Sequence, residues 1–322
     1  MFQNLKYNIK HKWGTQFALL VAYIMVVIFF SITSPVFFSF SNFMNILLFS
    51  SVTGVTVVAM CFGLISGSLD LSVGAVIGLT GIVVAMVIPY VGTFWAIILG
   101  LGTGVVCGTI NGFIITWGRI NPMIATLGTM SVFRGAAYLL SDARSISITN
   151  ESFRQIGRAQ LGGIVPVPVL ILLAAFFVGW IVLNKTTFGR TLHAIGGNSK
   201  ASYLAGIKIR RTRFMIFIVI SVMASLSGII ATAQTGAGIP RAALGSELDI
   251  VAAVILGGTS LAGGKGSMVG AFFGLIILST LTNGMVMLNI PAFWQMVATG
   301  IVLILAVYVD VLRGGGFERF KA

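Results

Sequence analysis

The sequence is short of charged residues. Of its 322 residues, 8% are Asp, Glu, Lys or Arg and 57% are hydrophobic, whereas ordinary soluble domains have about 25% and about 45–50%. A water-soluble globular protein is therefore excluded. Acidic residues are the scarcest, since 7 stand against 20 basic ones. In a membrane protein, basic residues indicate which loops lie on the cytoplasmic side. The basic excess therefore does not imply a nucleic-acid partner.

Residues that usually perform catalysis or bind metals are also few. The chain has two histidines, His11 and His193, and two cysteines, Cys61 and Cys107. Both cysteines fall inside apolar runs, which predicts buried thiols without a disulfide framework or metal-ligand spacing. Because the seven acidic residues are scattered along the chain, no catalytic cluster is predicted. We therefore expect neither an enzyme nor a cofactor or metal in this chain.

A glycine-rich string over 256–268 resembles a phosphate-binding loop only superficially. That motif needs Gly five residues before its Gly-Lys pair and a hydroxyl after it, but Thr259 and Gly266 occupy these positions. The string also lies between two apolar runs, so a helix break with Lys265 at the inner surface fits it better. We expect no ATP binding by this chain alone.

Long apolar runs are abundant, and a run of about 20 residues spans a bilayer core of roughly 30 Å. The sequence predicts an all-α polytopic membrane protein with about 10 transmembrane helices. The ten predicted spans are Thr15–Thr33, Phe43–Ile65, Val73–Ile88, Phe94–Trp117, Asn121–Leu140, Ile164–Leu183, Phe214–Thr232, Glu247–Gly263, Ser267–Asn283 and Phe293–Val309.

Three of these spans are short: the third, the eighth and the ninth. Glycine and serine join them to their neighbours, and irregular backbone is tolerated in membranes where it is buried in protein or lines a wet cavity. Broken or re-entrant helices are therefore predicted there. The string Val73–Leu79 also matches Val269–Leu275. The match indicates a two-fold internal repeat, with chance similarity of apolar glycine-rich strings as the alternative.

Basic residues predict the orientation. Strict alternation from a cytoplasmic N-terminus places 15 of the 20 lysines and arginines inside, as the positive-inside rule requires. The inside segments are 1–14, 66–72, 118–120, 184–213, 264–266 and 310–322. The first apolar run lacks a small-residue cleavage site and is predicted to be retained. We expect one membrane domain over 15–309, flanked by cytoplasmic tails at 1–14 and 310–322.

Four polar residues are candidates for the transport pathway or for helix caps: Asp70, Asn111, Thr259 and Ser260. Asp70 is the only acid placed to lie deep in the bundle, and intramembrane acids are usually functional. The alternative is a helix cap that satisfies free backbone N–H groups. We favour the structural role.

Four glycines in the fourth predicted span share one helix face. They recur every four residues, at Gly100, Gly104, Gly108 and Gly112, and such seams let transmembrane helices approach closely. Helix packing is therefore predicted for them. Asn111 adjoins the seam.

Arg134 is the one basic residue well inside a predicted span. About 13 residues from the inner end at Asn121, it lies roughly 20 Å along the helix, toward the outer surface. Glu247 and Asp249, at the outer start of the eighth predicted span, are the nearest acids by depth. We predict that Arg134 either pairs with one of them or extends to the outer interface without a partner.

The longest cytoplasmic segment, 184–213, has seven basic and no acidic residues. Within it, Asn198 can cap a short helix over 199–205, and Gly206 can end that helix. Ala201, Leu204 and Ala205 would share one face. A helix this short needs a docking surface. Anionic lipid headgroups and a soluble partner protein both fit that need.

Four strings resemble the permease subunit of ribose-type monosaccharide ABC importers: SGSLDLSVGAVIGLTG (66–81), GRINPMIATLGTMSVFRG (118–135), FGRTLHAIGGNSKASYLAGI (188–207) and ELDIVAAVILGGTSLAGGKGSMVGAFFG (247–274). The resemblance runs from about 34 to 309. One departure is Ser68, where the family often has glycine.

The resemblance implies several partners. They are a second copy of the chain around a central pathway, a cytoplasmic ATPase subunit that binds ATP and magnesium, and an extracytoplasmic sugar-binding protein, in the lipid of a bacterial inner membrane. It assigns the region of Gly196, Gly197 and Asn198 to the coupling loop that contacts the ATPase, which decides between the two docking surfaces. The resemblance also implies import of a monosaccharide or small polyol by an alternating-access mechanism. The alternative is a proton- or ion-coupled secondary carrier, in which Asp70 would have to titrate.

Overall fold

The computed structural model describes residues 19–313. The predicted tail 1–14, the start of the first predicted span and residues 314–322 of the C-terminal tail lie outside the described residues. The elements after the apolar helix Leu19–Thr33 are α2 (Phe40–Ile65), α3 (Val73–Thr116), α4 (Pro122–Ser141), β1 (Ile146–Ser147), α5 (Glu151–Arg158), β2 (Gln160–Leu161), β3 (Val165–Pro166), α6 (Val167–Lys185), α7 (Thr187–Gly197), α8 (Ser199–Leu204), α9 (Ile209–Thr235), β4 (Ala237–Gly238), α10 (Ser246–Leu256), α11 (Met268–Met287) and α12 (Ala292–Arg313).

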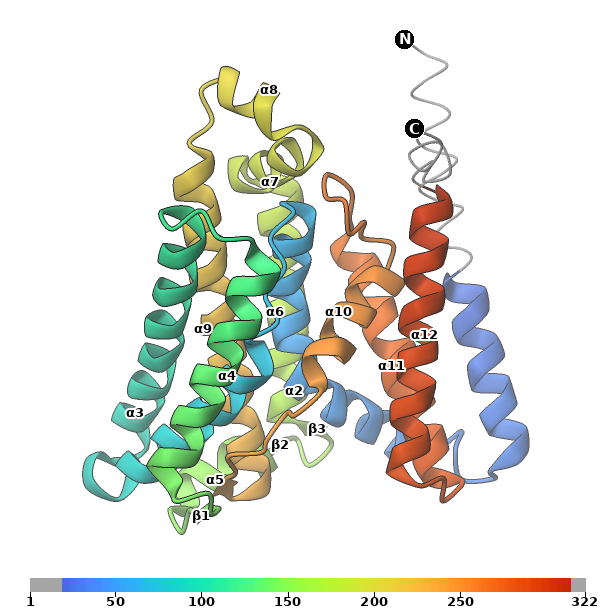
Figure 1. Cartoon of the computed structure of the whole chain (residues 1–322). Coiled ribbons are helices and arrows are strands. Elements are labelled where there is room, and N and C mark those ends of the chain that lie inside the picture. Colours follow the sequence, from blue (N-terminus) through green and yellow to red (C-terminus); the bar gives the residue numbers. More distant parts are fainter. Residues whose placement is uncertain (1–18, 314–322) are drawn as a thin grey trace.

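The structure is a bundle of apolar helices (Figure 1). Among residues 19–313, seven helices are long and apolar enough to cross a membrane. The short strands form two antiparallel pairs, β1 with β4 and β2 with β3, at the end opposite α8. The prediction of an all-α polytopic membrane protein is confirmed. We call the end that carries α7 and α8 the α8 face.

α3 contains both the third and the fourth predicted spans. The helix is broken at Gly92, whose φ of 73° is left-handed, and Pro89 precedes the break. Proline removes a backbone donor and glycine tolerates this conformation. One arm therefore runs from Val73 to the end opposite α8, and the other returns to the α8 face (Figure 1).

The eighth predicted span is wrong in its extent. The helix in this region, α10, has only 11 residues and ends at Leu256, so at 1.5 Å per residue it covers about half of a bilayer core. The loop after it includes Gly258, Gly263 and Gly264, all with positive φ. The ninth predicted span, in contrast, is a 20-residue helix, α11. A short broken helix was therefore predicted correctly at the eighth span but not at the ninth.

A second irregular segment joins α2 to α3. Residues 66–72 are not helical, although Ser66, Ser68, Asp70 and Ser72 are fully buried. This segment leads from the end of α2 at the α8 face to the start of α3 inside the bundle. The repeated apolar strings begin the helices that follow the two irregular segments, α3 and α11.

α2 is the most enclosed of the seven long helices. Of its most apolar 18-residue window 78% is buried, against 6% for α12. α9 packs along both α2 and α3, while α12 and the Leu19–Thr33 helix lie together at one side of the bundle (Figure 1). The central core is therefore built from α2, α3 and α9, and the irregular segment 66–72 lies within it.

Candidate functional site

α8 projects from the α8 face. Its first turn is capped by Asn198, whose Oδ1 accepts a hydrogen bond from the Ala201 N–H at 3.0 Å. It ends beside Gly206, which has a φ of 81°. The helix occupies residues 199–204, one residue shorter than predicted. The local signals of cap and terminator therefore form this helix as the sequence indicates.

The surface of α8 is apolar and uncovered. Leu204 is 85% exposed and Tyr203 71% exposed, and Ala201 and Ala205 are also exposed. Among the six residues of the helix, only Ser202 is buried. Two large apolar side chains on a six-residue helix offer a contact surface to a partner molecule.

α7 connects this surface to the core. The Gly264 N–H donates a hydrogen bond to the Ile65 carbonyl at 2.8 Å, and Gly196 lies directly against both residues. His193 Nδ1 lies 3.0 Å from the Gly264 carbonyl oxygen. A Cβ at Gly196 would collide with the Ile65 carbonyl oxygen, whereas a Cβ at Gly197 would meet nothing within 4 Å. The end of α7 is thus fixed to the end of α2 and to the loop after α10.

Asp70 is the centre of a buried polar cluster. Its Oδ1 accepts hydrogen bonds from the Ser72 backbone N–H at 2.8 Å and from the Ser72 hydroxyl at 2.6 Å. Asn111 donates through Nδ2 to Asp70 Oδ2 at 3.2 Å and to Ser72 Oγ at 2.8 Å. The Leu71 N–H donates to Thr126 Oγ1 at 3.1 Å. The cluster therefore fastens the irregular segment to both α3 and α4.

Thr259 and Ser260 stand at the end of α10, apart from Asp70. Thr259 is fully buried, and its Oγ1 lies 3.9 Å from the Cys61 sulfur. Ser260 donates to Asp310 Oδ2 at 3.0 Å, and the Leu261 N–H donates to the same oxygen at 3.1 Å. These contacts connect the loop after α10 to α2 and α12.

The glycine seam of α3 faces α9. A Cβ added at Gly104 would lie 2.5 Å from the Ser221 carbonyl oxygen, and one at Gly108 would lie 2.6 Å from the Ile218 Cα. At Gly112 it would meet the Phe214 ring at 2.7 Å, and at Gly100 the Val84 side chain at 2.7 Å and Ile229 at 3.3 Å. The seam brings the two backbones together along the arm of α3 that returns to the α8 face.

Arg134 does not form the ion pair predicted for it. It donates through Nη1 to the carbonyl oxygens of Pro240 and Ala242, each at 2.8 Å, and among the described residues no carboxylate oxygen lies within 4.0 Å of it. Glu247 instead lies against Gly74 of α3. Of the two alternatives for Arg134, the ion pair is wrong. Residues 239–245 are not helical and therefore offer free carbonyl groups, while Glu247 and Asp249 begin the short helix α10 well inside the bundle (Figure 1).

The sequence of the chain also matches a protein-family model. The model of the permease component of branched-chain amino acid transport systems matches residues 42–307, which include both irregular segments, the glycine seam and α8. The chain belongs to this permease family. Like the other family members it is a membrane permease and not an enzyme.

Curated relatives of the permease are similar over nearly their whole length. The ribose import permease protein RbsC of Bacillus subtilis is 42% identical over 89% of each chain. The L-arabinose transport system permease protein AraH of Escherichia coli is 39% identical over 92% of this chain and 90% of its own. The xylose transport system permease protein XylH of Escherichia coli is 32% identical over 91% of each. No solved structure gave a significant match. The resemblance to ribose-type permeases is confirmed.

Several contacts of the permease were not found by sequence reasoning. His193 and Asp310 fasten the loop after α10, and each is separated from its partner by at least 49 residues. A histidine inside a basic segment gave no signal of such a contact. The sequence shows that basic residues cluster in 184–213, but it gives no sign that Arg119 from another loop joins them in one pocket.

Proposed function

We propose that this permease imports a monosaccharide, with two copies of the chain enclosing the pathway. The names of the relatives include ribose, arabinose and xylose transport, which favours a pentose or similar sugar. An ATPase subunit and a sugar-binding protein are its partners. The observation that carries the mechanism is the exposed α8, fixed through Gly196 to the end of α2 and to the loop after α10.

The proposed orientation puts the α8 face in the cytoplasm of a bacterial cell, with the protein in the inner membrane. Support comes from the seven basic residues of 184–213 on this face, whereas only four, Arg144, Arg154, Arg158 and Arg241, occur in the connecting segments and α5 of the opposite end. Cytoplasmic segments of membrane proteins have such an excess. One permease domain over 15–309, with 184–213 as its coupling loop and cytoplasmic tails at 1–14 and 310–322, follows from this orientation.

Alternating access then has a defined mechanical path. The ATPase binds ATP and magnesium and pulls or pushes α8. α7 carries that displacement to the Ile65–Gly264 contact. Ile65 directly precedes the irregular segment 66–72, and Gly264 lies within the other irregular segment, 257–267. Packed elements transmit displacement because close-packed interiors deform little. Movement of these segments opens the pathway to one side and closes it to the other.

Replacing Leu204 with Asp tests the role of α8. A charge at this 85% exposed position leaves the folded permease intact but opposes an apolar contact, so we expect sugar uptake per ATP hydrolysed to fall by about tenfold or more. The measurement combines permease, ATPase and binding protein in proteoliposomes and records labelled-sugar uptake and phosphate release. Leu204→Met, which keeps an apolar side chain, is the matched control. Normal coupling in the Asp variant would refute the assignment.

Replacing Gly196 with Ala tests the connection between α7 and the core. The added methyl group must displace the backbone at Ile65, and such overpacking costs about 1–3 kcal/mol. The thermal unfolding midpoint of the permease alone should fall by several degrees, while Gly197→Ala, one residue away in open space, should leave it unchanged. Equal midpoints for the two variants would show that this contact does not hold α7.

The substrate and the energy source are tested together. Proteoliposomes with all three components receive labelled ribose, arabinose or xylose, with ATP or with a proton gradient alone. We expect uptake of one of these sugars that needs ATP and the binding protein and persists when the gradient is collapsed. Uptake driven by the gradient alone would support the secondary carrier instead.

A further inference from the structure

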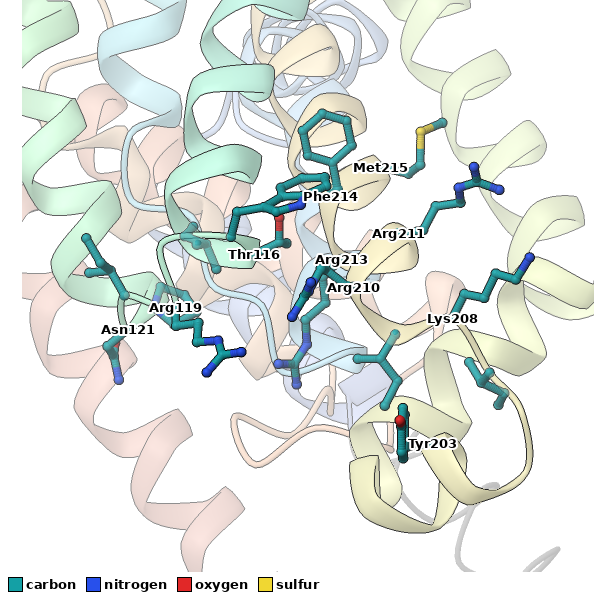
Figure 2. A pocket seen from close by; sticks show the side chains of 16 residues that line it. Thr116, Arg119, Asn121, Tyr203, Lys208, Arg210, Arg211, Arg213, Phe214 and Met215 are labelled. Atoms are coloured by element: carbon teal, nitrogen blue, oxygen red, sulfur yellow. The ribbon is translucent and has the colours of Figure 1, made fainter.

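A pocket of about 1160 Å³ opens on the α8 face, between the turn that joins α3 to α4 and the start of α9. Tyr203 of α8 lies at its edge (Figure 2). Within the part of the chain that the structure describes, no Asp or Glu lines the pocket. Five of its lining residues are basic: Arg119, Lys208, Arg210, Arg211 and Arg213.

The guanidinium groups gather toward one place. Arg119 extends from the turn after α3 toward Arg210 and Arg213 of α9, whereas Lys208 and Arg211 point away from that centre (Figure 2). Like charges that converge repel one another unless an anion lies between them. The ε nitrogen of Arg213 is buried and has no hydrogen-bond partner. The pocket therefore has positive charge and a free donor for an anion.

The start of α9 adds a second reason for an anion. This helix has no side-chain cap and no acidic residue in its first turn. Arg210 and Arg211 lie in its first turn, although the positive end of the helix dipole disfavours cations and favours anions. Exposed N–H groups at a helix N-terminus bind phosphate readily. A bound anion would satisfy both the helix end and the arginines.

The backbone conformation of Arg119 indicates that its side chain has a role in binding. Its φ of 55° is left-handed, a conformation that glycine adopts at much lower cost. Strained residues of this kind cluster at functional sites. An arginine kept in such a turn, with its guanidinium directed into the pocket, fits a binding role.

The surroundings of the pocket fit a lipid. Trp117 lines it and stacks on Phe113 with ring centroids 5.5 Å apart, and it meets the Phe214 ring edge-on at 5.1 Å. Phe113 is 59% and Ile124 68% exposed, so an apolar surface suited to lipid acyl chains lies beside the pocket. Aromatic residues concentrate at the headgroup level of bilayers.

We propose that this pocket binds the phosphate group of an anionic phospholipid from the leaflet on the α8 side. The phosphate lies between Arg119 and the arginines of α9, and the acyl chains lie along the apolar surface beside Trp117. Because Arg213 also donates to Ser199 Oγ of α8 at 3.3 Å, the bound lipid steadies α8. That last step rests on the proposed coupling role of α8, whereas lipid binding itself does not.

The test uses the purified full-length permease without its partners. It is incubated with phosphatidylcholine or phosphatidylglycerol in detergent, and intact-protein mass spectrometry measures the bound lipid. We expect wild type to retain phosphatidylglycerol in preference to phosphatidylcholine, and Arg119→Gln combined with Arg210→Gln to weaken that retention by about tenfold or more. Arg144→Gln combined with Arg158→Gln, at the opposite end, removes the same charge and should retain the lipid normally.

Further arms assign the source of the phosphate. Added inorganic phosphate should not displace the lipid; displacement at millimolar phosphate, with no preference among lipids, would assign the pocket to a free anion and overturn the proposal. Equal lipid retention by both double variants would also overturn it. Thermal unfolding verifies that each double variant is folded. If the pocket double variant does not fold, Arg210→Gln alone, at an exposed position, replaces it and should show an intermediate loss of lipid retention.

Discussion

A permease with leucine at Gly108 should not accumulate as a folded membrane protein. A Cβ at this position lies 2.6 Å from the Ile218 Cα and 2.7 Å from the Phe217 carbonyl oxygen, both in the backbone of α9. A backbone cannot rotate away as a side chain can, so α3 and α9 must separate. In membranes close packing is the main source of helix association, and the expected cost is at or above the upper end of the 1–3 kcal/mol typical of overpacking.

The measurement is the fraction of monodisperse protein after extraction, followed by its thermal unfolding midpoint. Gly102→Leu is the matched control, because it lies on the same arm of α3 and a Cβ there meets nothing within 4 Å. The control should accumulate as wild type does. A folded, transporting Gly108→Leu variant would mean that α3 and α9 do not approach as closely as the structure places them.

Local features of this fold could be predicted because their causes are local. The cap at Asn198 and the left-handed Gly206 are adjacent to the helix that they delimit, and the four-residue glycine spacing of α3 defines one helix face by itself. The identity of the facing helix is different. Nothing in the spacing at Gly108 indicates that residue 218 lies opposite, because helix pairing in a membrane depends on shape rather than on a pattern of charge or polarity.

The end of α10 shows why the eighth predicted span is longer than the helix. Hydropathy averages side-chain character, and residues 257–263 contain no charged residue and include Leu261 and Ala262. The apolar run therefore continues past the end of the helix. The backbone there is not helical, since Gly258 and Gly263 have positive φ. A full-length span would begin at the outer surface, so Glu247 is expected there and becomes the predicted partner of Arg134. Carbonyl groups of an irregular segment can satisfy an arginine equally well, but they have no sequence signature.

Asp70 has two candidate roles, and one pair of variants distinguishes them. Asp70→Leu removes the acceptor of the Ser72 N–H, the Ser72 hydroxyl and the Asn111 amide. Each buried donor left without a partner costs about 1–3 kcal/mol. We therefore expect segment 66–72 to lose its fixed conformation and sugar uptake to be abolished, with a markedly lower unfolding midpoint.

Asp70→Asn separates a positioning role from proton transfer. Asparagine keeps one oxygen that can accept from Ser72, but it cannot titrate. If Asp70 holds the irregular segment against α3, the Asn variant should retain a substantial part of ATP-driven uptake and an unfolding midpoint much closer to wild type than the Leu variant. A proton-coupled carrier predicts an equally stable Asn variant that has no uptake at all. The hydrogen bonds that Asp70 accepts from Ser72 and Asn111 favour the first outcome, because they fix segment 66–72 to α3.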